Sequence, residues 1–459
     1  MDVALSILAF IVAIGILVSV HEFGHFWVAR RLGFKVQRFS IGFGKPLARF
    51  KGRDPDRTEY WLSSIPLGGY VKMLDEREGP VPEAERHRAF NNRPAPQRIA
   101  VLLAGPGFNF LFAAVAYWLL FVTGVPGVKP YVGDVTPGSV AEVAGVRPAD
   151  VIESIGGEPT ETWEHATIAM LDELLKDGRL DMTVRGADGD LRQVELDVRG
   201  RVSELTEPDA LFMGLGLLPN IVRPPLLGEL TEDGPADRAG LEPGDRVVSV
   251  DGREIGSFEA FAGMVRQRPG ETVMLVVERG GERLELPLEV GSTVENGRTI
   301  GQALAWSSAE RPPGWEQLAE SLRAEQRYGP IEALTGGIAK TWDMSALTVR
   351  MLASMVVGDV SMRNISGPIT IAAYAGDTAQ LGLSAFLGFL AIVSISLGIL
   401  NLLPVPLLDG GQIVYQVAEW IKGAPLSERA MVFGQQLGML FMILLMGFVF
   451  YNDLTRVFN

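Results

Sequence analysis

The sequence contains no cysteine and only four histidines, and both scarcities narrow the chemistry open to it. Without cysteine there is no disulfide framework, and any metal ligands must be His, Asp or Glu. Basic residues are outnumbered too: the net charge of −14 argues against nucleic acid as a partner. At 459 residues, 47% of them hydrophobic, the chain is too long for one compact domain and too apolar for a wholly soluble protein.

Charged residues are almost missing from four apolar segments, each long enough to cross a bilayer. At 1.5 Å per residue the first segment reaches about 35 Å, against a hydrocarbon core of about 30 Å. The candidate spans are Ala4–Phe26, Ile99–Val125, Leu383–Leu403 and Ala430–Tyr451. They predict a polytopic helical membrane protein in contact with the lipid bilayer.

The charges between the spans predict its orientation. From Arg30 to Arg98 there are fifteen Lys/Arg against eight Asp/Glu, so the positive-inside rule places this segment in the cytoplasm. Residues 126–376, with a net charge of −17, then lie on the outer side, as do both ends of the chain.

Two of the four histidines lie inside the first span, in His21-Glu22-Phe23-Gly24-His25. Residues i and i+4 share a helix face, so His21 and His25 can bind one zinc ion, with Glu22 beside them to accept a proton from water. Ionisable side chains in a span are costly and indicate a functional site by default. The alternative is a pair of interfacial histidines bonded to lipid headgroups.

A catalytic zinc ion usually has a third protein ligand, and Asp409 is the best candidate. It follows Asn401, Pro404 and Pro406, and these prolines break the third span. A broken helix at membrane depth is tolerated only where protein or a cavity covers its backbone, which favours a functional site. The alternative is an Asp-Gly-Gly turn at the membrane surface, and a position at a span end of that kind fits Asp377 and Asp453 better.

The outer segment contains an internal repeat, in which residues 138–157 parallel residues 234–252 at a spacing of about 95 residues. Each copy predicts a short helix, a turn, a strand and a glycine turn, and resembles the bacterial PDZ domain. Ala149 replaces the turn glycine in the first copy. PDZ domains bind peptide C-termini by strand addition, and Met213–Pro219 could form the carboxylate loop of the second copy. The alternatives are an ordinary strand end there and a size-limiting cover over the active site.

The cytoplasmic segment alternates like strands over Val36–Lys45 and Thr58–Met73. An amphipathic sheet at the membrane face explains this pattern. The functional alternative is a sheet edge beside the zinc, where an unwound substrate finds partners for its backbone N–H and C=O groups.

The motif at His21–His25, paired with Asn401-Leu-Leu-Pro-Val-Pro-Leu-Leu-Asp-Gly410, resembles the site-two-protease family of intramembrane zinc metalloproteases. The likeness covers nearly the whole chain, including Gly105-Pro106 and Asn109 in the second span. The resemblance implies the following roles: Zn²⁺ held by His21, His25 and Asp409, Glu22 as the catalytic base, and substrate contacts at Asn401, Pro404 and Pro406.

The same resemblance implies a place and a substrate. The place is the bacterial cytoplasmic (inner) membrane, with the PDZ-like domains in the periplasm and the active site near the cytoplasmic side. The substrates are single-span membrane proteins already trimmed on the outer side, such as anti-sigma factors or remnant signal peptides. The alternative is a non-catalytic PDZ membrane adaptor. A metal transporter would need polar residues spread over several spans.

The predicted fold class is therefore four transmembrane helices with a membrane-associated β region and two inserted PDZ-like α+β domains. The predicted segments are 1–28 (first span), 29–97 (β region), 98–125 (second span), 126–212 and 213–308 (PDZ-like domains), 309–378 (amphipathic helical segment), 379–409 (third span), 410–429 (cytoplasmic loop) and 430–452 (fourth span).

Overall fold

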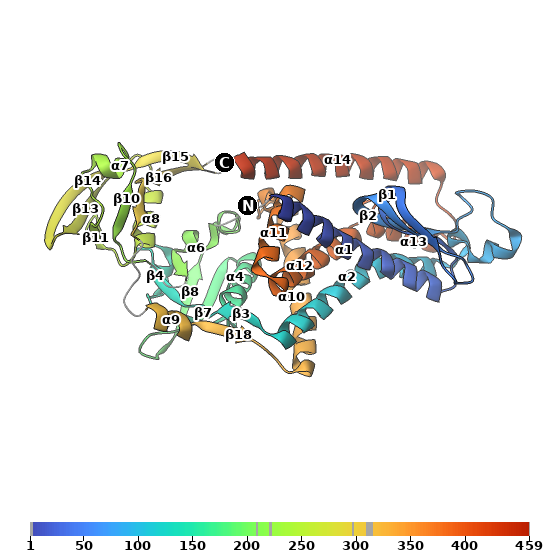
Figure 1. Ribbon diagram of the computed structural model, residues 1–459, viewed down its shortest axis with the longest axis horizontal. Coiled ribbons are helices and arrows are strands. Elements are labelled where there is room, and N and C mark those ends of the chain that lie inside the picture. Colours follow the sequence, from blue (N-terminus) through green and yellow to red (C-terminus); the bar gives the residue numbers. More distant parts are fainter. Residues whose placement is uncertain (1–2, 208–209, 220–222, 296–297, 309–314, 459) are drawn as a thin grey trace. The chain divides into compact units, whose positions relative to one another are not determined.

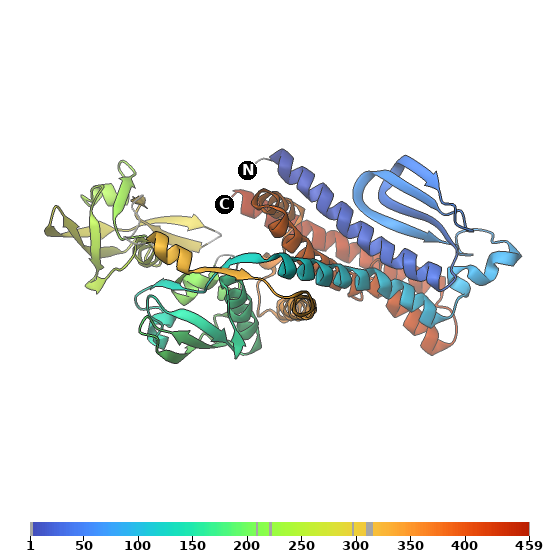
Figure 2. The ribbon, with the colours of Figure 1, turned by 60° about the horizontal axis from the view of Figure 1, so that its bottom comes forward.

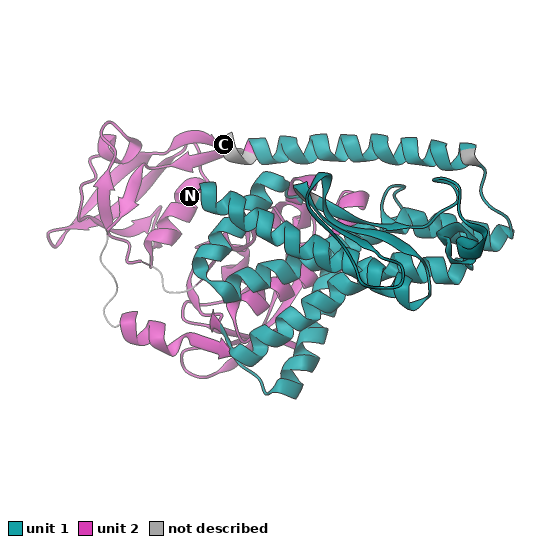
Figure 3. Cartoon of the chain, turned by 45° about the vertical axis from the view of Figure 1, so that its right-hand side comes forward, with its two compact units in different colours: residues 1–125, 327–349, 365–454 teal, residues 126–326, 350–364, 455–459 magenta. Residues whose placement is uncertain are grey.

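The computed structural model describes residues 3–207, 210–219, 223–295, 298–308 and 315–458 (Figure 1). Figure 3 shows their division into two compact units. The first unit consists of residues 1–125, 327–349 and 365–454, and the second of residues 126–326, 350–364 and 455–459.

The first unit contains the membrane helices. Over the described residues, four helices are long and apolar enough to cross a membrane, as predicted: Val3–Arg31 (α1), Ala95–Thr123 (α2), Leu383–Leu402 (α12) and Arg429–Thr455 within Glu428–Phe458 (α14). Helices α1 and α12 both pack against α2 (Figure 2). Apolar side chains such as Leu8, Leu111 and Leu444 are exposed on these helices, which suits a surface that meets lipid.

The predicted β region is a two-stranded antiparallel hairpin of β1 (Val36–Lys51) and β2 (Glu59–Met73). Residues 38–41 of β1 each pair with two residues of β2, as Phe39 does with both Tyr60 and Val71, so the two long strands fold back and this part of β1 is paired along both edges. Phe34 and Val36 are fully buried and pack with Phe26 of α1 and Val101 of α2. Two short 3₁₀ turns, η1 (Glu83–Arg88) and η2 (Phe90–Asn92), lead into α2.

The segment predicted as 309–378 is less uniform than expected, and its first residues, 309–314, lie outside the described residues. It contains α9 (Trp315–Ser321), β18 (Arg323–Gln326), α10 (Pro330–Val357) and η3 (Met362–Asn364). In α10, Gly337 permits a close crossing of α2, since a Cβ there would lie 2.9 Å from the Ala114 carbonyl oxygen. Ile331 and Trp342 on α10 are exposed, consistent with the predicted amphipathic helix.

The predicted boundary at residue 378/379 is wrong, because it cuts a helix. Helix α11 runs from Pro368 to Leu381, and Gly382 separates it from α12 with a φ of 114° that favours glycine. Beyond α12 the chain is non-helical until α13 (Asp409–Lys422) begins. The predicted break of the third span is therefore confirmed.

Asp453 of α14 caps the start of α11, where the Gly367 N-cap has no side chain to do so. Its carboxylate accepts hydrogen bonds from the backbone N–H groups of Gly367 (2.9 Å), Ile369 (2.8 Å) and Thr370 (3.3 Å), and from the Thr370 hydroxyl (2.6 Å). The side chain is fully buried. The interpretation of Asp453 as a surface turn residue is therefore wrong: it satisfies donors that a helix leaves unpaired.

Replacing Asp453 with Ala leaves these buried donors without an acceptor, so we expect the free energy of unfolding to fall by about 1–3 kcal/mol. Thermal unfolding in detergent measures this loss. Asp377→Ala is the matched control, since Asp377 is exposed on the same helix that Asp453 caps. Equal unfolding temperatures for the two variants would contradict the capping role.

The second unit contains the two copies of the repeat, and they share one topology. The first has a four-stranded sheet in the order β6-β5-β7-β8, and the second has the order β12-β11-β13-β14. The first copy and the strand before it comprise β3 (Val125–Val128), β4 (Val132–Val135), α3 (Val140–Ala144), β5 (Val151–Ile155), β6 (Glu158–Pro159), α4 (Trp163–Lys176), β7 (Arg179–Arg185), β8 (Leu191–Asp197), α5 (Val202–Leu205), α6 (Ala210–Leu215) and β9 (Leu217–Pro219). The second comprises β10 (Leu227–Leu230), α7 (Pro235–Arg238), β11 (Arg246–Val250), β12 (Arg253–Glu254), α8 (Phe258–Arg266), β13 (Thr272–Arg279), β14 (Glu282–Glu289), β15 (Gly291–Glu295), β16 (Arg298–Gln302) and β17 (Ala305–Ser307).

The repeated turn is preserved in both copies. Its aspartates, Asp150 and Asp245, are both buried, and each pairs with an arginine of the sheet, Arg192 and Arg279 respectively. Ala149 keeps the left-handed conformation of the glycine it replaces, with a φ of 70°. The turn therefore keeps its conformation in the first copy although alanine replaces glycine there.

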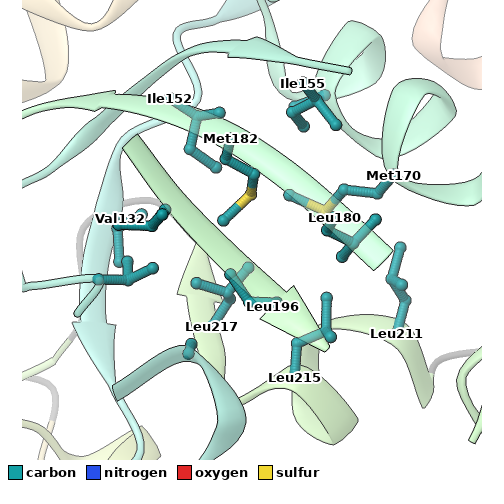
Figure 4. Close-up of a cluster of buried hydrophobic side chains, with 14 of the residues drawn as sticks. Val132, Ile152, Ile155, Met170, Leu180, Met182, Leu196, Leu211, Leu215 and Leu217 are labelled. Atoms are coloured by element: carbon teal, nitrogen blue, oxygen red, sulfur yellow. The ribbon is translucent and has the colours of Figure 1, made fainter. Parts of the chain in front are cut away.

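The predicted boundary at residue 212/213 is also wrong. Strand β9, which lies within Met213–Pro219, pairs with β4 of the first copy. Leu215 and Leu217 are fully buried in the core of that copy (Figure 4). The segment predicted as a carboxylate loop of the second copy thus belongs to the first. Burial of Leu215 and Leu217 in the core of the first copy stabilises this arrangement.

Candidate metal centre

Three side chains from α1 and α13 converge on one point. His21 Nε2 lies 3.1 Å and His25 Nε2 3.3 Å from Asp409 Oδ2, and the two Nε2 atoms are 3.2 Å apart. Both histidines are buried. The structure therefore brings together all three residues predicted as metal ligands, which over the described residues form the group of His, Asp and Glu suited to a metal ion.

The triangle of donor atoms fits zinc. A tetrahedral zinc ion with bonds of about 2.0–2.1 Å holds neighbouring ligand atoms about 3.3 Å apart, close to all three observed separations. Asp409 Oδ2 is buried and accepts no hydrogen bond of good geometry among the described residues, although two ring nitrogens face it. Three acceptor atoms facing one another are unfavourable unless a cation joins them.

Helix α2 carries the partners of the two histidine rings. The Val101 carbonyl lies 2.8 Å from His25 Nδ1, and Asn109 Nδ2 lies 3.2 Å from His21 Nδ1. Gly105, midway between them, faces both rings: a Cβ there would lie 2.6 Å from His25 Cε1 and 2.8 Å from His21 Cε1, and closer still to His25 Nε2. Residues 101, 105 and 109 follow the helical spacing i, i+4, i+8 and so form one face.

Glu22 projects from the same turn of α1 toward the β hairpin. The backbone N–H of Val71 in β2 donates a hydrogen bond to its carboxylate, and the group lies within electrostatic range of His21, His25 and Asp409. Gly69 permits this approach, since a Cβ there would lie 2.9 Å from Glu22 Cγ. The β hairpin therefore lies beside the cluster of His21, His25 and Asp409.

Asp409 is positioned by the break between α12 and α13. It is the first residue of α13, and Leu407 just before it has a φ of 112°, a strained conformation for a non-glycine residue. Gly410 permits the tight turn, since any Cβ on it would overlap the Leu402 carbonyl group. Strain of this kind persists only where the surrounding structure enforces it.

The three residues predicted to contact substrate lie at this break, and they differ in access. Asn401 is half-buried in the last turn of α12, and Pro404 is exposed. Pro406 is half-buried, and its carbonyl carbon lies 2.9 Å from the position of a Cβ on Gly438 of α14. Pro406 thus packs against α14, whereas the side chain of Pro404 is exposed.

Sequence reasoning missed the backbone groups at this site. The Val101 carbonyl and the Val71 N–H carry no residue-type signal, and only the fold places them beside His25 and Glu22. Asn109 had a signal, as a polar residue in an apolar span, yet nothing in the sequence tied it to His21.

The chain matches the model of peptidase family M50 over residues 9–445. It is 43% identical to the regulator of sigma-E protease RseP of Escherichia coli strain K12, over 98% of both chains. It is 41% identical to protease RseP of Yersinia pestis over 100% of both chains. A solved HtrA-type protease AlgW with decapeptide aligns with 36% of this chain and 54% of its own at 19% identity, but the TM-score of 0.16 carries no argument.

The chain therefore belongs to peptidase family M50, and it is a zinc-dependent metalloprotease integral to a membrane. Its relatives over nearly the full length are regulator of sigma-E proteases. The alternative of a non-catalytic adaptor is set aside.

Proposed function

We propose that this enzyme cleaves peptide bonds within the membrane-spanning segment of single-span proteins. The observation that carries the proposal is the triangle of His21, His25 and Asp409 donor atoms, in which both histidines lie on a helix long and apolar enough to cross a bilayer. A protease site at that depth acts on chains that enter the membrane. The three triangle residues are the zinc ligands in this proposal.

His21, His25 and Asp409 would hold the zinc ion, which would supply a Lewis acid to polarise the scissile carbonyl and lower the pKa of the attacking water. Glu22 accepts the proton of the attacking water and passes it to the leaving amine. The Val71 N–H orients the Glu22 carboxylate for both transfers. Asn401 donates to the unwound substrate backbone or to the developing oxyanion, and Pro404 lines the path by which that backbone enters.

The β hairpin supplies the other requirement of this reaction. A helical substrate must unwind before cleavage, and unwinding in lipid strands its N–H and C=O groups. Strand addition along residues 69–73 of β2, each of which has a single partner among the described strands, satisfies those groups beside Glu22.

The wider setting of the proposal follows from charge and from the relatives. Cytoplasmic placement of residues 30–98 puts the active site near the cytoplasmic face of the inner membrane and the two PDZ-like domains in the periplasm. There the domains exclude substrates with a large outer domain, or bind newly made peptide C-termini. The substrates are then anti-sigma factors or remnant signal peptides, after trimming on the outer side.

Cleavage of a tagged single-span peptide by the purified protein in detergent tests the proposal. We expect cleavage within the span, full loss of cleavage with a zinc chelator, and recovery when zinc is restored. Asp409→Asn should lose both zinc and activity. A matched substrate that keeps a folded outer domain should be cleaved far more slowly.

Two results would contradict the proposal. Cleavage that persists in the zinc-free protein would remove the metal from the reaction. Cleavage confined to residues outside the span would make the enzyme a surface protease instead.

A further inference from the structure

We propose that Asn109 is a positioning residue that holds His21 in the tautomer able to bind zinc, through a hydrogen bond from His21 Nδ1–H to Asn109 Oδ1. This inference rests on the proposed zinc site. It concerns the orientation of the His21 ring and the zinc affinity of that site.

The tautomer of each histidine follows from its second partner. A neutral imidazole has one N–H and one lone pair, and a ligating Nε2 must present its lone pair, which leaves the proton on Nδ1. His25 meets this condition, because its Nδ1 faces the Val101 carbonyl, which can only accept. His21 Nδ1 faces the side chain of Asn109 at 3.2 Å, and an amide can either accept or donate.

The orientation of that amide decides whether His21 can bind the metal. With Nδ2 toward the ring, the amide donates to Nδ1 and forces the proton onto Nε2, within the ligand triangle. A half-turn of the amide exchanges Nδ2 and Oδ1 with no change in shape. Oδ1 then accepts from Nδ1–H, and Nε2 is free for zinc.

No hydrogen bond among the described residues opposes the half-turn. Asn109 is fully buried, yet its Oδ1 accepts no hydrogen bond from any described residue. The half-turn therefore breaks only the contact with His21, which reforms with the opposite polarity. Metal-bound histidines regularly donate their second N–H to such an acceptor.

Close packing of α2 against α1 and α12 fixes the position of the Asn109 backbone. Ser394 Oγ of α12 donates to the Asn109 carbonyl oxygen at 2.9 Å, and Ser394 is fully buried as well. Helix α2 is pressed onto α1, since a Cβ on Gly24 would lie 2.9 Å from the Ala104 carbonyl carbon.

Zinc affinity tests the inference directly, by competition with a chromogenic chelator on purified full-length protein in detergent. Asn109→Leu keeps the side-chain volume and removes the acceptor, so we expect its zinc dissociation constant to rise about 10–100-fold. Asn109→Asp restores an acceptor for Nδ1–H, and its affinity should equal or exceed that of the wild type. Cobalt substitution gives a second readout, since a displaced His21 changes the visible spectrum of bound Co²⁺ in Asn109→Leu alone.

Ser394→Ala is the matched control, because it removes a buried hydrogen bond to Asn109 without touching its amide. It should keep wild-type zinc affinity. Wild-type affinity in Asn109→Leu would overturn the inference, and so would an equal loss in Asn109→Asp or in Ser394→Ala. Should Asn109→Leu fail to fold, Asn109→Ala and Asn109→Asp make the same comparison. Absence of zinc from the wild-type protein would instead overturn the proposed function.

Discussion

Glu22→Gln should lower turnover about 10²–10⁴-fold while zinc content stays at the wild-type level. Gln has nearly the shape of Glu and still accepts from the Val71 N–H at its carbonyl oxygen, so the β hairpin keeps its place. What Gln cannot do is accept the proton of the attacking water. Single-turnover cleavage of the trimmed substrate, with metal analysis of the same preparation, measures both quantities.

Asp377→Asn provides the control for this experiment. It makes the same carboxylate-to-amide change at an exposed position of α11, and it should leave both turnover and zinc unchanged. Turnover in Glu22→Gln within about tenfold of the wild type would remove Glu22 as the base. Loss of zinc from that variant would instead show that Glu22 supports the metal.

Gly105→Ala should abolish zinc binding and reduce turnover by about 10²-fold or more, since a displacement of about 1 Å is enough for such a loss. The added methyl carbon overlaps the rings of both histidines. Alanine in a helix interior is itself favourable by about 0.5–1 kcal/mol relative to glycine, so the helix is not weakened. The loss therefore reports on the site alone.

Gly107→Ala is the matched control on the same helix, because a Cβ there meets no atom within 4 Å. We expect wild-type zinc content and turnover, with equal or higher thermal stability. Wild-type zinc affinity in Gly105→Ala would contradict the close contact of α2 with the rings of His21 and His25. Metal analysis and thermal unfolding of both variants decide the matter.

The sequence predicted those features that depend on residue type and spacing. The four spans follow from apolar runs, and the candidate ligands His21, His25 and Asp409 follow from polar groups in or beside apolar helices, which are rarely tolerated there without function. The repeat in the second unit follows from its turn residues, and the two sheets do have the same strand order.

Features that depend on long-range packing were not predictable from the sequence. Asp453 is 86 residues from Gly367, and its role depends on donors that no sequence pattern reveals. The assignment of β9 to the first copy depends on which core buries Leu215 and Leu217. The amide of Asn109 contacts His21 only because α2 lies antiparallel beside α1. The same packing places the Val101 carbonyl beside His25.

The cap on α11 also bears on how the chain is assembled as it leaves the ribosome. Translation reaches Asp453 86 residues after Gly367, a delay of roughly 4–17 s at about 5–20 residues per second. During that interval the first turn of α11 lacks this carboxylate acceptor, and Asp409 is made about halfway through it. Final docking of α11 must await the last span. All three residues of the proposed metal site are thus synthesised before the contact between α14 and α11 can form.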